Sequence, residues 1–149
     1  MWVQAMDEEA CRAFLEQAQI GRLGCAFDGQ PYVMPMVMAY EADRLYALTT
    51  FGQKIDWMRQ NPKVCVLFDE IRTRFDWVSV IVYGRYLELV EPRYSEQRQR
   101  GRALLAQRER WWETPLAAGQ VDAGEHLIEP ILFAVEIDTV SGLRTTAMG

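Results

Sequence analysis

The segment with the clearest chemical potential is Thr49-Thr50-Phe51-Gly52-Gln53-Lys54, which joins an expected strand to an expected short helix. It places two hydroxyl groups, free backbone N–H groups and an ammonium at the start of that helix, where the helix dipole also favours negative charge. Lys54 stands out because only Lys54 and Lys63 are lysines among the 16 cationic residues. The segment indicates a phosphate-binding site, with ordinary capping and turn formation as the alternative.

A second candidate is an apolar strand that contains alternating methionines. Both of its faces are apolar, with Tyr32, Met34, Met36, Met38 and Tyr40 on one and Val33, Pro35, Val37 and Ala39 on the other. Thioethers pack well on aromatic rings, so the methionine face is either plain core or a surface for a flat ligand. Pro35 cannot donate to a neighbouring strand, which indicates an edge, a bulge or a ligand lying alongside.

Three other side chains are candidates for lining a binding site. Trp77 and Ser79 lie two residues apart and therefore on one strand face, where a stacking surface would sit beside a hydroxyl. Trp111, one of two adjacent tryptophans, could cover a pocket. Packing in the core is the alternative interpretation for Trp77 and Ser79, whereas two adjacent tryptophans usually mean that one is buried and one is partly exposed.

Composition and charge exclude several classes of function. The chain has 149 residues, which predicts a single domain over 1–149. Its formal charge of −5 argues against a nucleic-acid partner, because that affinity depends on clustered cations. One histidine, His126, and three widely spaced cysteines provide neither a metal site nor a disulfide framework. With no apolar run long enough to span a membrane and no secretion signal, we expect a cytoplasmic protein with a small-molecule substrate.

The hydropathy pattern predicts the elements that must position these residues. Strands are expected over 20–27, 32–40, 44–50, 64–68, 77–90 and 131–137, and helices over 7–18, 53–60 and 95–110. Residues 70–76 are expected to form a polar loop, and Asp28-Gly29 a hairpin turn. Because strands and helices do not alternate regularly, we expect a mainly β fold with short helices, a six-stranded antiparallel barrel rather than a parallel sheet.

Several short segments keep a characteristic order: 20–23, 29–36, 45–46, 52–55, 59–65, and 77–80 leading to Gly84-Arg85. In order and spacing they resemble the pyridoxamine 5′-phosphate oxidase-like superfamily of FMN-binding split barrels, including its nitroimidazole-resistance-type relatives. The resemblance covers most of residues 20–89. It implies a Greek-key-like split barrel that binds FMN at the interface of a homodimer.

The resemblance also implies roles for individual residues. Lys54 and Thr49 would meet the FMN phosphate, the flavin ring would lie beside Met34–Met38, and Ser79 would make a polar flavin contact. The expected cofactor contacts are therefore Met34, Pro35, Met36, Val37, Thr49, Thr50, Gln53, Lys54, Trp77, Ser79 and Trp111. No catalytic side chain and no metal ligand is assigned.

The sequence departs from the family pattern at positions that concern the substrate. Met34 and Gln53 stand where the oxidases carry arginines, and the arginine motifs that hold pyridoxamine phosphate are not visible in 131–149. Leu48-Thr49-Thr50 stands where nitroimidazole-resistance-type relatives have a histidine. These departures argue against oxidation of pyridoxamine phosphate and leave the nitroimidazole substrate class open.

The expected function is an FMN-dependent oxidoreductase that passes hydride or electrons from a reduced donor to a small planar acceptor. Three alternatives remain open. The chain could be a non-catalytic flavin-binding or sensing module, a related barrel that holds deazaflavin or haem, or a cofactor-free dimeric structural barrel. His126 as the single histidine makes haem ligation the poorest fit.

Overall fold

A computed structural model describes residues 2–108 and 130–146. Over these ranges the chain forms β1 (Trp2–Met6), α1 (Glu8–Gln17), β2 (Ile20–Phe27), β3 (Gln30–Glu41), β4 (Arg44–Thr50), α2 (Gln53–Gln60), β5 (Lys63–Thr73), β6 (Asp76–Glu88), α3 (Ser95–Ala106) and β7 (Pro130–Thr146). None of the helices in these ranges has both the length and the apolar character that crossing a membrane requires.

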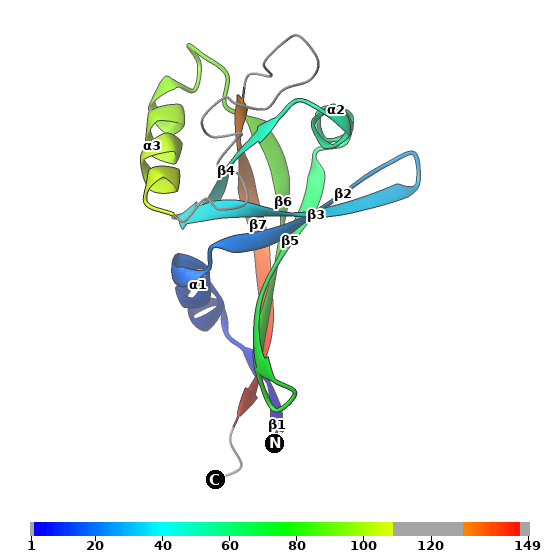
Figure 1. The fold of residues 1–149 in the computed structure, drawn as a ribbon, viewed down its shortest axis with the longest axis vertical. Coiled ribbons are helices and arrows are strands. Elements are labelled where there is room, and N and C mark those ends of the chain that lie inside the picture. Colours follow the sequence, from blue (N-terminus) through cyan, green and yellow to red (C-terminus); the bar gives the residue numbers. More distant parts are fainter. Residues whose placement is uncertain (1, 109–129, 147–149) are drawn as a thin grey trace.

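Six of the strands close into an antiparallel ring (Figure 1). The strand order is β1-β7-β4-β3-β2-β5-β6, and β6 also pairs with β7, which closes the barrel. This arrangement confirms the expected mainly β split barrel. Strand β1 was not predicted; it extends the sheet by pairing with the end of β7, where Met6 lies opposite Gly142.

Strands β5 and β7 extend further than the sequence indicated. The expected loop over 70–76 is largely strand, and the last strand runs to residue 146 rather than 137. Polar side chains in the β5–β6 hairpin pair with one another: Arg72 Nε donates to Asp76 at 2.8 Å, and Arg72 also lies 2.8 Å from Glu70. Because these side chains are exposed, the segment lacks the apolar alternation by which a strand is recognised.

Apolar packing lies on both sides of β3, as its two apolar faces predict. Met36 and Met38 are buried in the barrel interior, and Val37 and Ala39 are buried on the outside in a second cluster with Leu105 of α3. Helix α3 ends earlier than predicted, at Ala106.

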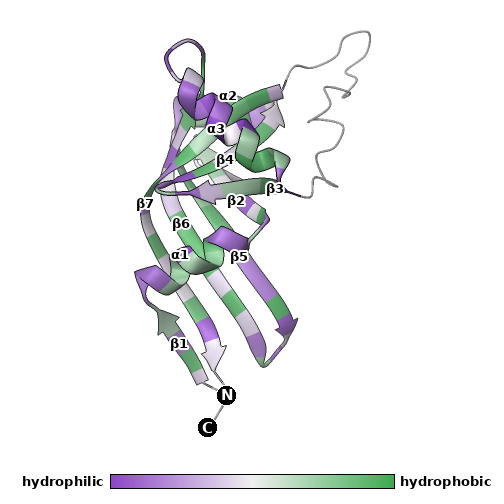
Figure 2. Ribbon diagram, turned by 90° about the vertical axis from the view of Figure 1, so that its left-hand side faces the viewer, coloured by the Kyte–Doolittle hydropathy of each residue, from purple (hydrophilic) through white to green (hydrophobic). Residues whose placement is uncertain are grey.

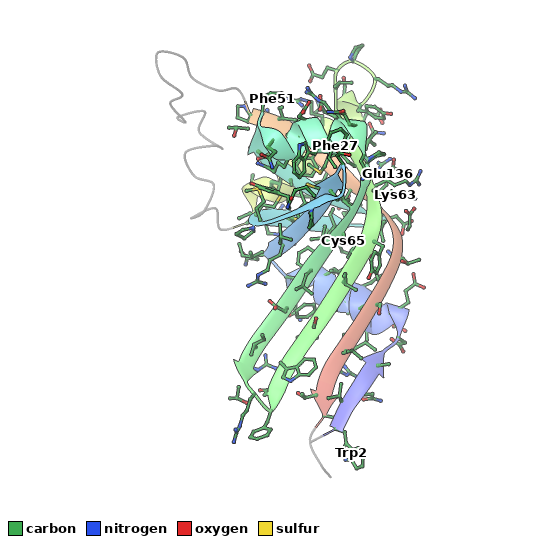
Figure 3. All side chains as sticks on the ribbon, turned by 90° about the vertical axis from the view of Figure 1, so that its right-hand side faces the viewer. Trp2, Phe27, Phe51, Lys63, Cys65 and Glu136 are labelled. Carbon is green, nitrogen blue, oxygen red and sulfur yellow. The ribbon has the colours of Figure 1, made fainter. Side chains whose placement is uncertain are left out.

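Helix α1 covers the inner face of the long strands (Figure 2). Its amino terminus is capped by Asp7, the first residue of the expected helix, because Ala10 N donates to the Asp7 carboxylate at 2.8 Å. Phe14 and Leu15 are buried against the barrel. On the opposite side no described helix lies over β5 and β6, and in Figure 3 this outer face is turned to the viewer with α1 behind it.

Candidate functional site

Strands β3 and β4 separate at one end of the barrel. They pair only from Met38 opposite Ala47 to Glu41 opposite Arg44. Beyond Ala47, β4 continues to pair with β7, whereas residues 34–37 of β3 pair with β2 alone. Within the described residues, one backbone edge of 34–37 therefore has no strand partner, and this is where Pro35 indicated an interruption of the ladder.

Thr49 lies next to this open edge and is a buried polar side chain. It falls on the same face of β4 as Leu45 and Ala47, which belong to the interior core. The residue is only 1% exposed, and its hydroxyl has no hydrogen-bond partner among the residues that the structure describes. Leaving a buried hydroxyl unsatisfied costs about 1–3 kcal/mol. A bound ligand that accepts a hydrogen bond would remove this cost.

Helix α2 begins immediately after the separation of the two strands. Gly52 is the residue before its first turn, and no side chain caps that end. Helix dipole and backbone N–H groups therefore favour an anion at Gln53 and Lys54. Gln53 is exposed, and Thr50 is half-buried on the α3 side of β4.

Lys54 is largely buried, with 9% of its surface exposed. Burial raises the pKa of the nearby Cys25 thiol, and the ammonium of Lys54 opposes that rise by favouring the thiolate. The charge of Lys54 therefore acts on Cys25 of β2 as well as at the start of α2. This cationic side chain lies at the same end of the barrel as Thr49 and the open edge of β3.

A group of polar side chains attaches α2 to the barrel. Arg59 forms two hydrogen bonds with the Glu88 carboxylate, at 2.8 and 3.1 Å, and the Tyr86 hydroxyl donates to Glu88 at 2.7 Å. Arg59 holds the pKa of Glu88 below its usual range, while burial and the bond to Glu88 raise that of Tyr86. The guanidinium of Arg59 also lies 5.2 Å from the ring centroid of Phe51. We call Arg59, Glu88 and Tyr86 the α2 clamp.

The β3 residues expected to contact a ligand have different environments. Met34 is half-buried against the interior core, and its sulfur accepts a weak hydrogen bond from the Tyr32 hydroxyl at 3.9 Å. Pro35 is half-buried. Met36 and Val37 are fully buried in the two cores, so their backbone rather than their side chains faces the open edge.

Trp77 and Ser79 lie on the outer face of β6, away from Lys54. Neighbouring Val80 and Val82 point into the core, so Ser79 points outward. Ser79 is six residues from Arg85, which pairs with Lys63 just after α2, and six residues of strand span about 20 Å. The structure therefore places Thr49, Gln53, Lys54 and the edge of 34–37 at one end of the barrel, with Thr50 on the opposite face of β4. Trp77 and Ser79 do not lie at this end. Trp111 lies outside the described residues.

Sequence reasoning missed Phe51 and the α2 clamp. Phe51 stands inside the segment that attracted attention, but its exposure depends on how β4 meets α2. Arg59 and Glu88 are separated by 29 positions, and only the pairing of β5 with β6 brings them together. A contact between residues so far apart in the chain cannot be predicted from a local sequence pattern.

The comparisons with known proteins agree with this architecture. A family model described as pyridoxamine 5′-phosphate oxidase matches residues 7–144. A relative from Rhizobium meliloti (strain 1021), described as uncharacterized, is 37% identical over 152 residues, covering 99% of this chain and 98% of the relative.

Two solved structures extend the comparison. A protein from Mesorhizobium loti described as FAD-binding is 36% identical with a TM-score of 0.81, covering 98% of this chain and 100% of that chain. A Bacteroides thetaiotaomicron VPI-5482 protein, described as a putative 5-nitroimidazole antibiotic resistance protein, has a TM-score of 0.67 at 19% identity, covering 97% and 89%, and shows the fold alone. By family match and fold, the chain belongs to the pyridoxamine 5′-phosphate oxidase-like split-barrel family.

Proposed function

We propose that this protein binds a flavin whose phosphate lies at the start of α2, where Thr49 donates a hydrogen bond and Lys54 supplies the positive charge. The observation that carries the proposal is the buried Thr49 hydroxyl, which lacks a hydrogen-bond partner within residues 2–108 and 130–146 and lies near the start of α2, an end that no described side chain caps. The similarity to a solved protein described as FAD-binding, at 36% identity, supports the flavin assignment.

The ligand that we propose for this site is FMN. When bound, the flavin would supply the transfer of hydride or electrons from a reduced donor to a small planar acceptor. The chain's own residues would bind and orient it. Lys54 neutralises phosphate charge, the open backbone edge at 34–37 offers peptide groups to the ring, and Met34 gives a polarizable apolar contact. No side chain is assigned to proton transfer. Anaerobic reduction by a nicotinamide donor would separate an oxidoreductase from a non-catalytic flavin-binding module.

Replacing Thr49 with valine tests the assignment of its hydroxyl. In Thr49→Val the buried, unpartnered hydroxyl disappears, so the flavin-free protein should be as stable as the wild type or more stable, by up to about 1 kcal/mol. Flavin affinity should nevertheless fall about fivefold, because one hydrogen bond to the phosphate is lost. Urea unfolding and flavin titration measure the two effects. Lower stability of the flavin-free variant with unchanged affinity would assign the hydroxyl to folding instead.

We also propose a homodimer with the flavin at its interface. Five large apolar side chains on the outer face of the sheet are between 47% and 69% exposed: Val3, Val33, Ile71, Tyr83 and Leu143. An exposed apolar face of this kind is typical of a protein interface. Since Ser79 lies on this face and Lys54 does not, a flavin contacting both types of residue would use two copies of the chain.

The dimer proposal predicts a molar mass in light scattering of twice 17.3 kDa. Substituting Tyr83 with aspartate should weaken the dimer, because a charge would enter the apolar face. If the wild-type protein has the mass of one chain with flavin bound, the interface proposal is wrong while the binding site of a single chain stands.

A further inference from the structure

Phe51 presents an aromatic ring to solvent directly before the first turn of α2. Its side chain is 52% exposed, and Gly52 and Gln53 follow it immediately. Figure 3 shows Phe51 beside α2. Single exposed apolar side chains are common, so exposure alone does not identify a binding surface. Phe51 differs from most other exposed apolar residues because the guanidinium of Arg59 lies over its ring.

One face of the Phe51 ring is covered by an anchored guanidinium. Arg59 lies 5.2 Å from the ring centroid, within the range of a cation–π contact. Arg59 is itself fixed by its two hydrogen bonds to Glu88, which also accepts the Tyr86 hydroxyl. The α2 clamp therefore fixes the ring from one side, and the remaining exposed surface is flat, apolar and already oriented.

The charge balance at this surface indicates the kind of group that it would take. Because Glu88 neutralises Arg59, the α2 clamp gives the surface of the Phe51 ring no excess of charge that would attract or repel an uncharged group. A flat, uncharged aromatic group that is tethered to a phosphate at the start of α2 fits both the exposed ring and this charge balance. Nucleobases are such groups, and they stack on aromatic side chains with little dependence on the base.

We propose that Phe51 stacks a nucleobase linked through a ribose and a second phosphate to the flavin phosphate, so that the chain binds a flavin dinucleotide with its FMN half in the site described above. This rests on the proposed function, since a base reaches Phe51 only if the phosphate lies at the start of α2. The adenine of FAD is the base that the ring would receive. A nicotinamide dinucleotide also carries adenine, so the test must compare the two.

The test is a titration of flavin-free protein with FMN, FAD and NADH, following flavin fluorescence or heat. The wild type should bind FAD about tenfold more tightly than FMN, as expected from one stacked base. Phe51→Ala should remove this preference and leave the FMN affinity within about twofold, whereas Phe51→Trp should retain it. NADH should neither compete with FAD nor respond to the Phe51 variants.

Phe75 supplies a matched control, because it is also an exposed phenylalanine below an arginine. Its side chain is 57% exposed, and Arg74 lies 4.5 Å from its ring centroid. It lies in the turn between β5 and β6, distant in the fold from α2. Phe75→Ala should therefore keep the tenfold preference for FAD.

The outcomes separate this inference from the proposed function. Equal affinities of the wild type for FMN and FAD would overturn the stacking role while leaving the flavin site in place. Equal losses of both affinities in Phe51→Ala would show that the ring only supports the start of α2, and a loss confined to NADH would assign it to another nucleotide. Failure of the wild type to bind any flavin would overturn the proposed function as well.

Discussion

Lys54→Met should weaken flavin binding about 10- to 100-fold. A charge-assisted hydrogen bond to a phosphate contributes about 1.5–3 kcal/mol, and the burial of Lys54 limits competition from water. Methionine keeps most of the apolar stem, so the packing around this buried position is disturbed less than by alanine. The measurement is a titration of the flavin-free variant with FMN, followed by flavin fluorescence.

Lys63 provides the matched control, because it is the other lysine of the chain and is exposed at the start of β5. Lys63→Met makes the same change in charge and composition without touching the start of α2. Its flavin affinity should stay within about twofold of the wild type. Equal losses in the two variants would mean that net charge rather than the position of Lys54 determines binding.

Gly84→Ala should destabilise the fold by about 3 kcal/mol, a typical cost of overpacking where the surroundings cannot relax. A Cβ atom at Gly84 would lie 2.2 Å from the backbone oxygen of Glu136 and 2.8 Å from Val135 Cγ1. The backbone oxygen of Glu136 cannot move aside, because Glu136 is paired with β4 on one side and with β6 on the other. The register between β6 and β7 also shifts at this point, between Tyr83 and Gly84. Urea unfolding should therefore show a lower midpoint with an unchanged slope.

Gly52→Ala is the corresponding control for stability. No atom lies within 4 Å of a Cβ placed at Gly52, so the substitution should cost less than about 1 kcal/mol, mainly through capping of α2. If Gly84→Ala unfolds at the same urea concentration as Gly52→Ala, then β6 and β7 do not approach each other as closely as described.

Local sequence features predicted the elements nearest the site well. The bounds of β4 and α2 are those expected, because a polar turn over 41–43 precedes the strand and Asn61-Pro62 follows the helix. The hairpin at Asp28-Gly29 is confirmed by positive φ angles of 52° and 77°, the conformation that this pair favours. Capping of α1 by Asp7 followed from the same kind of short-range signal.

Features that depend on distant pairing were not predicted. Strand β1 has only five residues, four of them exposed, and the second half of β7 carries polar residues on exposed surfaces. They are recognised as strands only through the pairing of β7 with β1 and with β6. The separation of β3 from β4 was indicated by Pro35, but the unpartnered hydroxyl of Thr49 emerges only from the packed barrel. The expectation that Ser79 and Lys54 contact the same flavin likewise depends on the proposed homodimer. The hydropathy pattern of one chain does not specify how two copies pack together.

The most direct test of flavin binding is the visible absorption spectrum of the purified protein, recorded before and after incubation with FMN and removal of unbound ligand. Flavin bands should be present at once or appear after incubation, saturating at one flavin for each chain. A colourless protein that retains no flavin under these conditions would contradict the account, and a Soret band would point to haem instead.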